Sequence, residues 1–410
     1  MRLINKETLE LSEFFGSDIP TYVILSHTWT KEEVTLREWS NPSDATTSKT
    51  GYKKICMACS LARRHGYSWI WVDTNCIDKT SSAELSEAIN SMFGWYRNAA
   101  TCFAYLEDVT KDNSTEEPDK AVPRSSIVSQ LCASRWFTRG WTLQELIAPS
   151  SLGFYSREWA WLGNRADFVG EISDTTGIDK EYLYPREVRN TGLPIFLEAP
   201  VATRMSWVSK RQTTRIEDIA YCMLGIFDIN MPLLYGEGPK AFLRLQEEII
   251  RRQNDHTIFA WGTGFNIAHT IEERPQPMGI GVLAPSPLAF LNTKRASKIL
   301  SQQLSMLVPS PYSLTNSGLS IKLPVLRTAY GCIAILDTDL AAISTKFDSP
   351  TSRQVRSLGA LLPTRRKNIR PPRVEGMDLA ILKPIGAKWR QMSTVWDAKR
   401  RSRHCRIPIS

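Results

Sequence analysis

The sequence predicts an α/β protein built on a parallel sheet that helices wrap. Short apolar runs of strand length alternate with longer segments whose apolar residues recur at helical spacing. Polar residues gather directly after several of these runs, where a parallel sheet carries its binding site. The expected strands are Tyr22–Ser26, Trp69–Asp73, Thr101–Leu106 and Ser151–Tyr155.

The segments between these runs carry the start and stop signals of helices. One helix is expected from Tyr52 to His65, with Gly66 as its C-terminal stop. A second starts at Ser81, where Glu84 three residues later completes a capping box. A third, short helix lies between the third and fourth strands. It is expected to begin at Gly140 and to end at Pro149.

This short helix contains the main candidate for chemistry. Trp141 and Glu145 are four residues apart in it and share one face. A carboxyl beside an indole loses water, so the pKa of Glu145 is expected to rise. Glu145 is therefore a candidate catalytic or ribose-binding group. The alternative is an exposed helix glutamate next to a surface tryptophan.

Further candidates follow the first two predicted strands. Ser26, His27 and Trp29 come at the end of the first strand, and Asp73 at the end of the second. The carboxyl ends of parallel strands meet at one edge, so we expect these residues to line one site. Structural roles stay open for two of them: His27 as a histidine that braces its loop, and Asp73 as a cap of its own loop.

The chain divides into four parts. Residues 1–165 form the α/β domain, 166–262 a helical extension, 263–345 a smaller β-rich region, and 346–410 a basic, flexible tail. In the extension, helices are expected over Thr213–Gly225 and from Pro239 onward.

Composition and charge exclude several classes of protein. The chain has 410 residues, of which 42% are hydrophobic, and no run approaches the ~18 apolar residues of a membrane span. The N-terminus lacks the apolar core of a signal peptide, so we expect a cytoplasmic protein. The net charge of +9 is concentrated in Thr364–Arg373 and Lys399–Arg403. These runs are compatible with a nuclear localisation signal. No motif for nucleic-acid recognition accompanies them, so nucleic acid is not the expected partner.

No metal or phosphate site is expected. Cys56 and Cys59 form one CxxC pair within a helical run, and no second pair stands at zinc-ligand spacing. Both are interpreted as core helix residues. The turn Gly236–Gly238 lacks the GxxxxGK[ST] pattern of a phosphate loop and is interpreted as a turn before a helix.

Three ordered blocks resemble the signature blocks of the fungal heterokaryon incompatibility (HET) domain. They are YVILSHTW at Tyr22–Trp29, WVDTNCID at Trp71–Asp78 and RGWTLQE at Arg139–Glu145. With flanking runs, the similarity covers about residues 1–262. Thr30 stands where the family usually has glycine, and Asn75 where cysteine is common. The resemblance implies a role in non-self recognition that ends in growth arrest or cell death.

HET domains are in turn similar to TIR domains, which implies a TIR-like sheet with flavodoxin-like strand order. In NAD-cleaving TIR domains the glutamate of the third block is catalytic, which here is Glu145. NAD would then be a substrate, with no permanently bound cofactor. Trp29 or Trp141 would stack on it, and Ser26 and His27 would contact ribose or phosphate. Asp73 would orient the site.

Two other mechanisms remain open. The same fold also works as a non-enzymatic module that self-associates and recruits other incompatibility proteins. Self-association is expected under both readings, because catalysis by TIR-like domains often needs assembly. The second alternative is thiol chemistry by Cys76 with His27, for which the sequence shows neither an orienting group nor an oxyanion hole.

Overall fold

The computed structural model describes residues 1–111, 123–184, 195–261, 282–291 and 293, and short strands between residues 296 and 407. By their internal packing the residues form two units. The first comprises Met1–Glu198 with Lys210–Ala241, and the second Ala199–Ser209 with Phe242–Ser410. The four parts expected from the sequence remain a prediction.

The first unit is built on a seven-stranded sheet with the order β2-β1-β4-β3-β5-β6-β7. Its four central strands are parallel and are the four apolar runs that the sequence predicts: β3 (Val23–His27), β4 (Trp69–Trp71), β5 (Thr101–Tyr105) and β6 (Leu152–Tyr155). The first of them, β3, lies between β4 and β5. The winding of the chain therefore reverses at β3, which places a switch point at its carboxyl end.

The edges of the sheet are antiparallel, so the prediction of a purely parallel sheet is wrong there. β1 (Arg2–Asn5) pairs antiparallel with both β2 (Leu11–Glu13) and β4, and β7 (Trp161–Asn164) pairs antiparallel with β6. These three strands have three or four residues each and mix polar with apolar side chains. Such short segments carry no clear period-2 pattern, so the sequence does not identify them.

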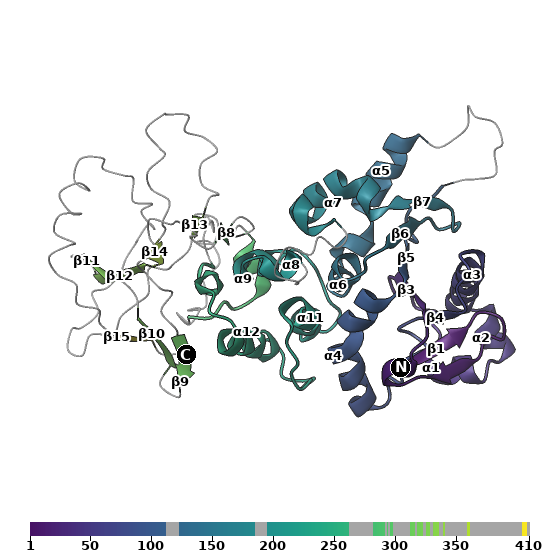
Figure 1. Ribbon diagram of the computed structural model, residues 1–410, viewed down its shortest axis with the longest axis horizontal. Coiled ribbons are helices and arrows are strands. Elements are labelled where there is room, and N and C mark those ends of the chain that lie inside the picture. The colour runs from purple at the N-terminus through teal and green to yellow at the C-terminus, as the bar shows by residue number, and fades with distance from the viewer. Residues whose placement is uncertain are drawn as a thin grey trace. The chain divides into compact units, whose positions relative to one another are not determined.

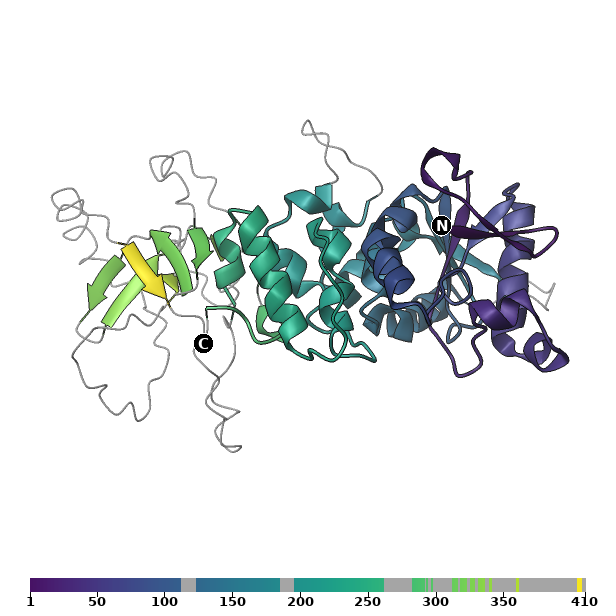
Figure 2. The same ribbon diagram turned by 90° about the horizontal axis from the view of Figure 1, so that it is seen from below.

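Helices cover both faces of the sheet (Figures 1 and 2). α3 (Thr50–Arg64) lies on one side, and α4 (Ser82–Asn98) and α6 (Thr142–Ile147) lie on the other. α4 buries one apolar face, and its Tyr96 packs edge-on against Trp71 of β4. This packing positions α4 and α6 beside the carboxyl end of β3.

Only half of the capping box expected for α4 is present. The Ser81 side chain accepts a hydrogen bond from the amide of Glu84 at 3.3 Å. The carboxylate of Glu84 does not accept a hydrogen bond from the amide of Ser81, because it binds the amide of Asp78 at 2.7 Å and the guanidinium of Arg2. Glu84 thereby ties the N-terminal strand to the start of α4.

The remaining helices of the first unit are short: α1 (Leu36–Ser40), α2 (Asp44–Ser48), α5 (Arg124–Ala133), α7 (Val169–Thr176), α8 (Ile195–Glu198), α10 (Asp218–Tyr221) and α11 (Leu224–Phe227). The continuous helix predicted over Thr213–Gly225 is wrong. Residues 212 and 213 lie against the segment before α6, and two short helices, α10 and α11, follow. Gly225 lies within α11 and packs on Phe93 of α4 instead of ending a helix.

The second unit combines helices with small sheets. It includes α9 (Val201–Ser206) and most of α12 (Lys240–Arg252), which begins directly after Pro239 as predicted. Two three-stranded sheets have the orders β15-β10-β9 and β11-β12-β14, and a two-stranded sheet pairs β13 with β8. Their strands are β8 (Ala296–Ser297), β9 (Tyr312–Thr315), β10 (Gly318–Lys322), β11 (Val325–Thr328), β12 (Gly331–Ile335), β13 (Asp339–Leu340), β14 (Gly359–Ala360) and β15 (His404–Ile407).

Most strands of the second unit fall in the region expected to be β-rich. The last two, β14 and β15, fall in the segment expected to be a flexible tail. The basic runs Thr364–Arg373 and Lys399–Arg403 lie outside the described residues. In the part of the chain that the structure describes, no helix has the length and apolar character to cross a membrane.

Candidate functional site

Helix α6 meets the carboxyl end of β3 at a buried pair, Ser26 and Glu145. The hydroxyl of Ser26 donates a hydrogen bond to Oε2 of Glu145 and accepts one from Nε1 of Trp136 at 2.8 Å. Trp136 belongs to a short 3-10 helix, η3 (Arg135–Thr138). The hydroxyl of Tyr96, on α4, also interacts with the carboxyl of Glu145 and donates to the carbonyl of Leu25 at 3.3 Å. The carboxyl is thus held by side chains from two other elements, β3 and α4, and Trp136 of η3 supports Ser26.

The environment of Glu145 disfavours its charged form. Ser26 is fully buried, and Glu145 is only 7% exposed. Burial raises the pKa of Glu145 to about 8; the hydrogen bond from Ser26 opposes this shift, and the negative charge of Asp73 adds to it. A carboxyl with this pKa changes its charge close to neutral pH, which is typical of groups that act in acid–base or electrostatic catalysis.

A second cluster lies around Asp73, just after β4. One carboxylate oxygen of Asp73 is 3.0 Å from Nε2 of His27, and the other accepts a hydrogen bond from Nε1 of Trp29 at 2.8 Å. The ammonium of Lys79 lies 3.5 Å from the centroid of the Trp29 ring. Burial disfavours the charge of Asp73, but the positive charge of Lys79 and the hydrogen bonds from His27 and Trp29 outweigh it and lower the pKa of Asp73 to about 2. Asp73 is therefore an ionised anchor for both aromatic rings.

The two clusters share the end of β3. Ser26 and His27 are consecutive residues of this strand, so their side chains leave it on opposite faces. The structure brings Ser26 together with Glu145, and His27 together with Trp29 and Asp73. The electrostatic effect of Asp73 on Glu145 links the two groups.

Several buried polar atoms in this region have no hydrogen-bond partner among the described residues: Nδ1 of His27, Oγ1 of Thr74, Nδ2 of Asn75 and Nη2 of Arg211. An unpaired buried polar group costs about 1–3 kcal/mol. These atoms are therefore available to a ligand or to water. Beside them, Trp29 is 48% exposed. Its carbonyl and the hydroxyl of Thr28 accept hydrogen bonds from Arg135 at 3.4 and 3.1 Å.

Comparisons with known proteins match part of the region that carries this site. Residues 22–125 match the family described as heterokaryon incompatibility protein (HET), and residues 240–335 match a domain of unknown function, DUF8212. The chain is 48% identical over 254 residues to the vegetative incompatibility protein HET-E-1 of Podospora anserina.

The chain contains a HET domain. It is homologous to HET-E-1 over 61% of its own length, but this alignment covers 18% of HET-E-1. No solved structure is significantly similar to the chain. The family match includes Ser26, His27, Trp29 and Asp73 and ends before α6, which carries Glu145.

The tryptophan of the third block lies elsewhere than expected. Trp141 is the residue before α6, and its side chain forms a hydrogen bond with Asp218 of α10. The indole that reaches the Ser26–Glu145 pair is that of Trp136. Trp141 thus connects the start of α6 to α10.

Sequence reasoning missed four residues of the site. Tyr96 lies among the apolar residues buried by α4, and Trp136 lies in a 3-10 helix that has no periodic signal. Lys79 and Arg211 are single basic residues, which carry no motif. Their positions depend on contacts between segments far apart in the chain, so a sequence pattern does not reveal them.

Of the two cysteines interpreted as core residues, Cys59 is buried and Cys56 is half-buried. Cys56 and Cys59 lie on α3, and burial raises the pKa of both thiols. The sulfur of Cys76 accepts a hydrogen bond from the amide of Val72 at 3.4 Å, and burial raises its pKa to about 12. A thiol with this pKa is a poor nucleophile at neutral pH, which argues against thiol chemistry with His27. The described residues include no group of three or more side chains able to hold a metal ion.

The backbone amides of the glycine turn before α12 are already hydrogen-bonded to a side chain of the protein. Oε1 of Glu217 accepts hydrogen bonds from the amides of Gly236 and Gly238, at 2.8 and 3.0 Å. A phosphate would need these same amides. The arrangement agrees with the interpretation of this segment as a turn.

Proposed function

We propose that this HET domain acts in fungal non-self recognition and triggers growth arrest or cell death by cleaving the nicotinamide–ribose bond of NAD. The observation that carries the proposal is the position of Glu145. Its carboxyl lies beside Ser26 at the carboxyl end of the central strand β3, where α/β sheets bind their ligands. The homology to HET-E-1, whose name describes vegetative incompatibility, supports the biological role.

The topology supports the interpretation of this domain as TIR-like. The parallel strands have the spatial order β4-β3-β5-β6. Numbered along the chain from β3, this is the order 2-1-3-4 of flavodoxin-like sheets. Glu145 follows the third of these strands and faces the first, which is the place that the TIR resemblance assigns to the catalytic glutamate.

The proposed reaction needs one well-placed carboxylate. As the bond between C1′ of the ribose and the nicotinamide nitrogen breaks, its electron pair goes to nicotinamide, which leaves as a neutral molecule. The ribose passes through an oxocarbenium-like state, which ionised Glu145 stabilises while binding ribose hydroxyls. Water then adds to C1′ and releases a proton, which gives ADP-ribose. The leaving group is already activated by its positive charge, so no strong general acid is required.

The second cluster offers contacts for the rest of the dinucleotide. Lys79 and Arg135 both contact Trp29, and their positive charges suit a diphosphate. Lys79 covers part of the Trp29 ring, while Trp29 as a residue remains 48% exposed and can stack on a flat heterocycle. Asp73 holds Trp29 and His27 in place for these contacts.

Catalysis requires the site to open. Glu145 is almost inaccessible, and its hydrogen bond with Ser26 occupies the carboxyl that would bind ribose. In this proposal, self-association of the domain supplies the opening. The closed state also keeps Glu145 largely protonated at neutral pH, and so inactive.

A non-enzymatic signalling module is the second candidate. The same burial favours it, because a glutamate enclosed by Ser26, Trp136 and Tyr96 also fits a purely structural role. In that case the HET domain would kill by recruiting partners, and the carboxyl of Glu145 would serve only to hold α6 against β3.

Expression in a fungal host separates the two candidates. The wild-type chain is expected to lower viability and cellular NAD together, and Glu145→Gln at equal protein level is expected to restore both. Glu87→Gln is the matched control, because Glu87 is an exposed glutamate on α4; this variant should behave like the wild type. Killing that persists in Glu145→Gln with unchanged NAD would rule out NAD cleavage and support the signalling module.

A further inference from the structure

The segment that follows the HET domain reaches the first turn of α6. The amide of Gly140 donates to the carbonyl of Gln212 at 2.8 Å, and the amide of Gln212 donates to the carbonyl of Thr138 at 2.7 Å. Residues 139 and 212 form a parallel bridge. A Cβ atom at Gly140 would lie 2.5 Å from the side chain of Thr213, so the close approach requires glycine at this position.

These contacts place Arg211 against the start of α6. Arg211 is 7% exposed. Its Nη1 donates to the carbonyl of Arg139 at 2.8 Å and to Oγ1 of Thr142 at 3.0 Å. Thr142 in turn donates to the carbonyls of Arg139 and Trp136, so Arg211 braces the junction between η3 and α6.

The guanidinium of Arg211 binds α6 on the helix face that also carries Glu145. Thr142 and Glu145 are three residues apart on α6 and therefore lie on one face of the helix. Nη2 of Arg211 is buried and has no partner among the described residues. A buried cation with an unused donor is costly unless a negative charge compensates it. The carboxyl of Glu145 is the acidic group on the adjacent turn.

We propose that Arg211 is a positioning residue for Glu145, which holds the first turn of α6 in place and stabilises the carboxyl in its ionised form. Arg211 and Glu145 both lie outside the HET family match, so residues beyond the matched segment build this part of the site. The catalytic part of this inference rests on the proposed NAD cleavage. The electrostatic part does not.

The other groups that act on Glu145 come from the elements packed around it. Ser26 on β3 and Tyr96 on α4 form hydrogen bonds with its carboxyl, and Asp73 after β4 repels its negative charge. The charge of Arg211 lowers the pKa of Glu145, although burial of the carboxyl has the larger, opposite effect. Burial lowers the pKa of Arg211 itself to about 10, so it remains a cation at pH 9.

A four-member cycle tests the electrostatic link without using activity. Unfolding in urea is measured at pH 6 and pH 9 for the wild type, Arg211→Gln, Glu145→Gln and the double variant. Arg211→Gln is expected to reduce the folding equilibrium constant at least five-fold more at pH 9 than at pH 6 when Glu145 is present. In the Glu145→Gln background its cost is expected to be the same at both pH values. Equal costs in both backgrounds would overturn the proposal and leave Arg211 a structural brace.

Arg211→Lys keeps the charge and guards against a variant that fails to fold. Because the charge is kept, its cost is expected to depend less on pH than that of Arg211→Gln, and a folded lysine variant with the same pH-dependent cost as Arg211→Gln would contradict the role of charge. Nicotinamide release then tests the catalytic part: Arg211→Gln should lower the rate about ten-fold at pH 7 and shift its rise to higher pH, and Arg211→Lys should restore the profile. If the coupling is present but the wild type releases no nicotinamide, the proposed function fails and the electrostatic inference stands.

Discussion

The stability gained by replacing Glu145 with glutamine is expected to grow as the pH rises. The folded site favours the protonated carboxyl, so between its ordinary pKa of 4.5 and its raised pKa of about 8 the folded protein binds more protons than the unfolded chain. The wild type therefore loses stability as the pH increases through this range, whereas a glutamine at this position does not titrate. At ~1.4 kcal/mol per pKa unit, the difference between the two proteins should increase by roughly 3–4 kcal/mol from pH 5 to pH 8.

Urea unfolding at pH 5, 6, 7 and 8 measures this difference. Glu87→Gln, at an exposed position of α4, serves as the control and should show no comparable dependence on pH. A gain for Glu145→Gln that stays constant over the whole range would mean that Glu145 is ionised in the folded protein. The carboxyl of Glu145 would then not be largely protonated in the folded protein at neutral pH.

Gly225→Ala is expected to be strongly destabilising. A Cβ atom at Gly225 would lie 2.0 and 2.2 Å from Cβ and Cγ of Phe93, which joins α11 to α4. Neither atom is at the flexible end of a side chain, so the helices themselves must move apart. Overpacking of this kind typically costs about 1–3 kcal/mol, and we expect the upper end or more. Thermal or urea unfolding of the purified variant measures the loss.

Gly94→Ala is the matched control for that variant. Gly94 is the neighbour of Phe93 on α4, and a Cβ atom there meets nothing within 4 Å. Alanine is favoured over glycine within a helix by about 0.5–1 kcal/mol, so this change should stabilise the protein. If both alanine variants have the same effect, the close packing of α11 on α4 is not what Gly225 provides.

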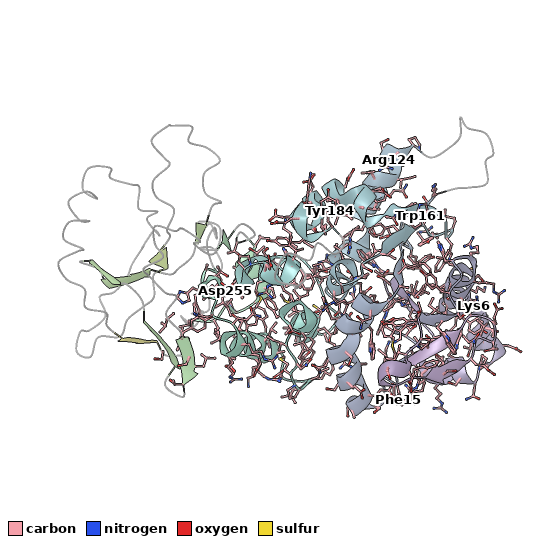
Figure 3. All side chains as sticks on the ribbon, viewed as in Figure 1. Lys6, Phe15, Arg124, Trp161, Tyr184 and Asp255 are labelled. Atoms are coloured by element: carbon pink, nitrogen blue, oxygen red, sulfur yellow. The ribbon has the colours of Figure 1, made fainter. Side chains whose placement is uncertain are left out.

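The central strands of the fold could be predicted because their signal is local. β3 and β5 are apolar runs buried on both faces, and such runs are recognised without knowing their neighbours. The edge strands β1, β2 and β7 lack this signal, since partial exposure leaves polar residues in them. Trp161, the first residue of β7 (labelled in Figure 3), illustrates the same limit, because this large aromatic residue is 44% exposed.

The candidate site was only partly predictable for a similar reason. The rule that parallel strands end at one edge correctly groups His27, Trp29 and Asp73. The i,i+4 rule placed Trp141 beside Glu145, but α6 begins at Thr142, and the Trp141 side chain turns to Asp218. Which indole, tyrosine or arginine reaches Glu145 depends on how distant segments pack, and no spacing within one segment reports that.

Nicotinamide release from NAD by the purified chain is the most direct test of the account, measured at pH 6 and pH 9 at protein concentrations that permit self-association. Because Glu145 must be ionised to act, the wild type should release nicotinamide faster at pH 9 than at pH 6. Glu145→Gln should lower the rate about 100-fold or more, and Glu87→Gln should leave it unchanged. Release that survives in Glu145→Gln, or no release by the self-associated wild type, would contradict the assignment of Glu145 as the catalytic carboxylate.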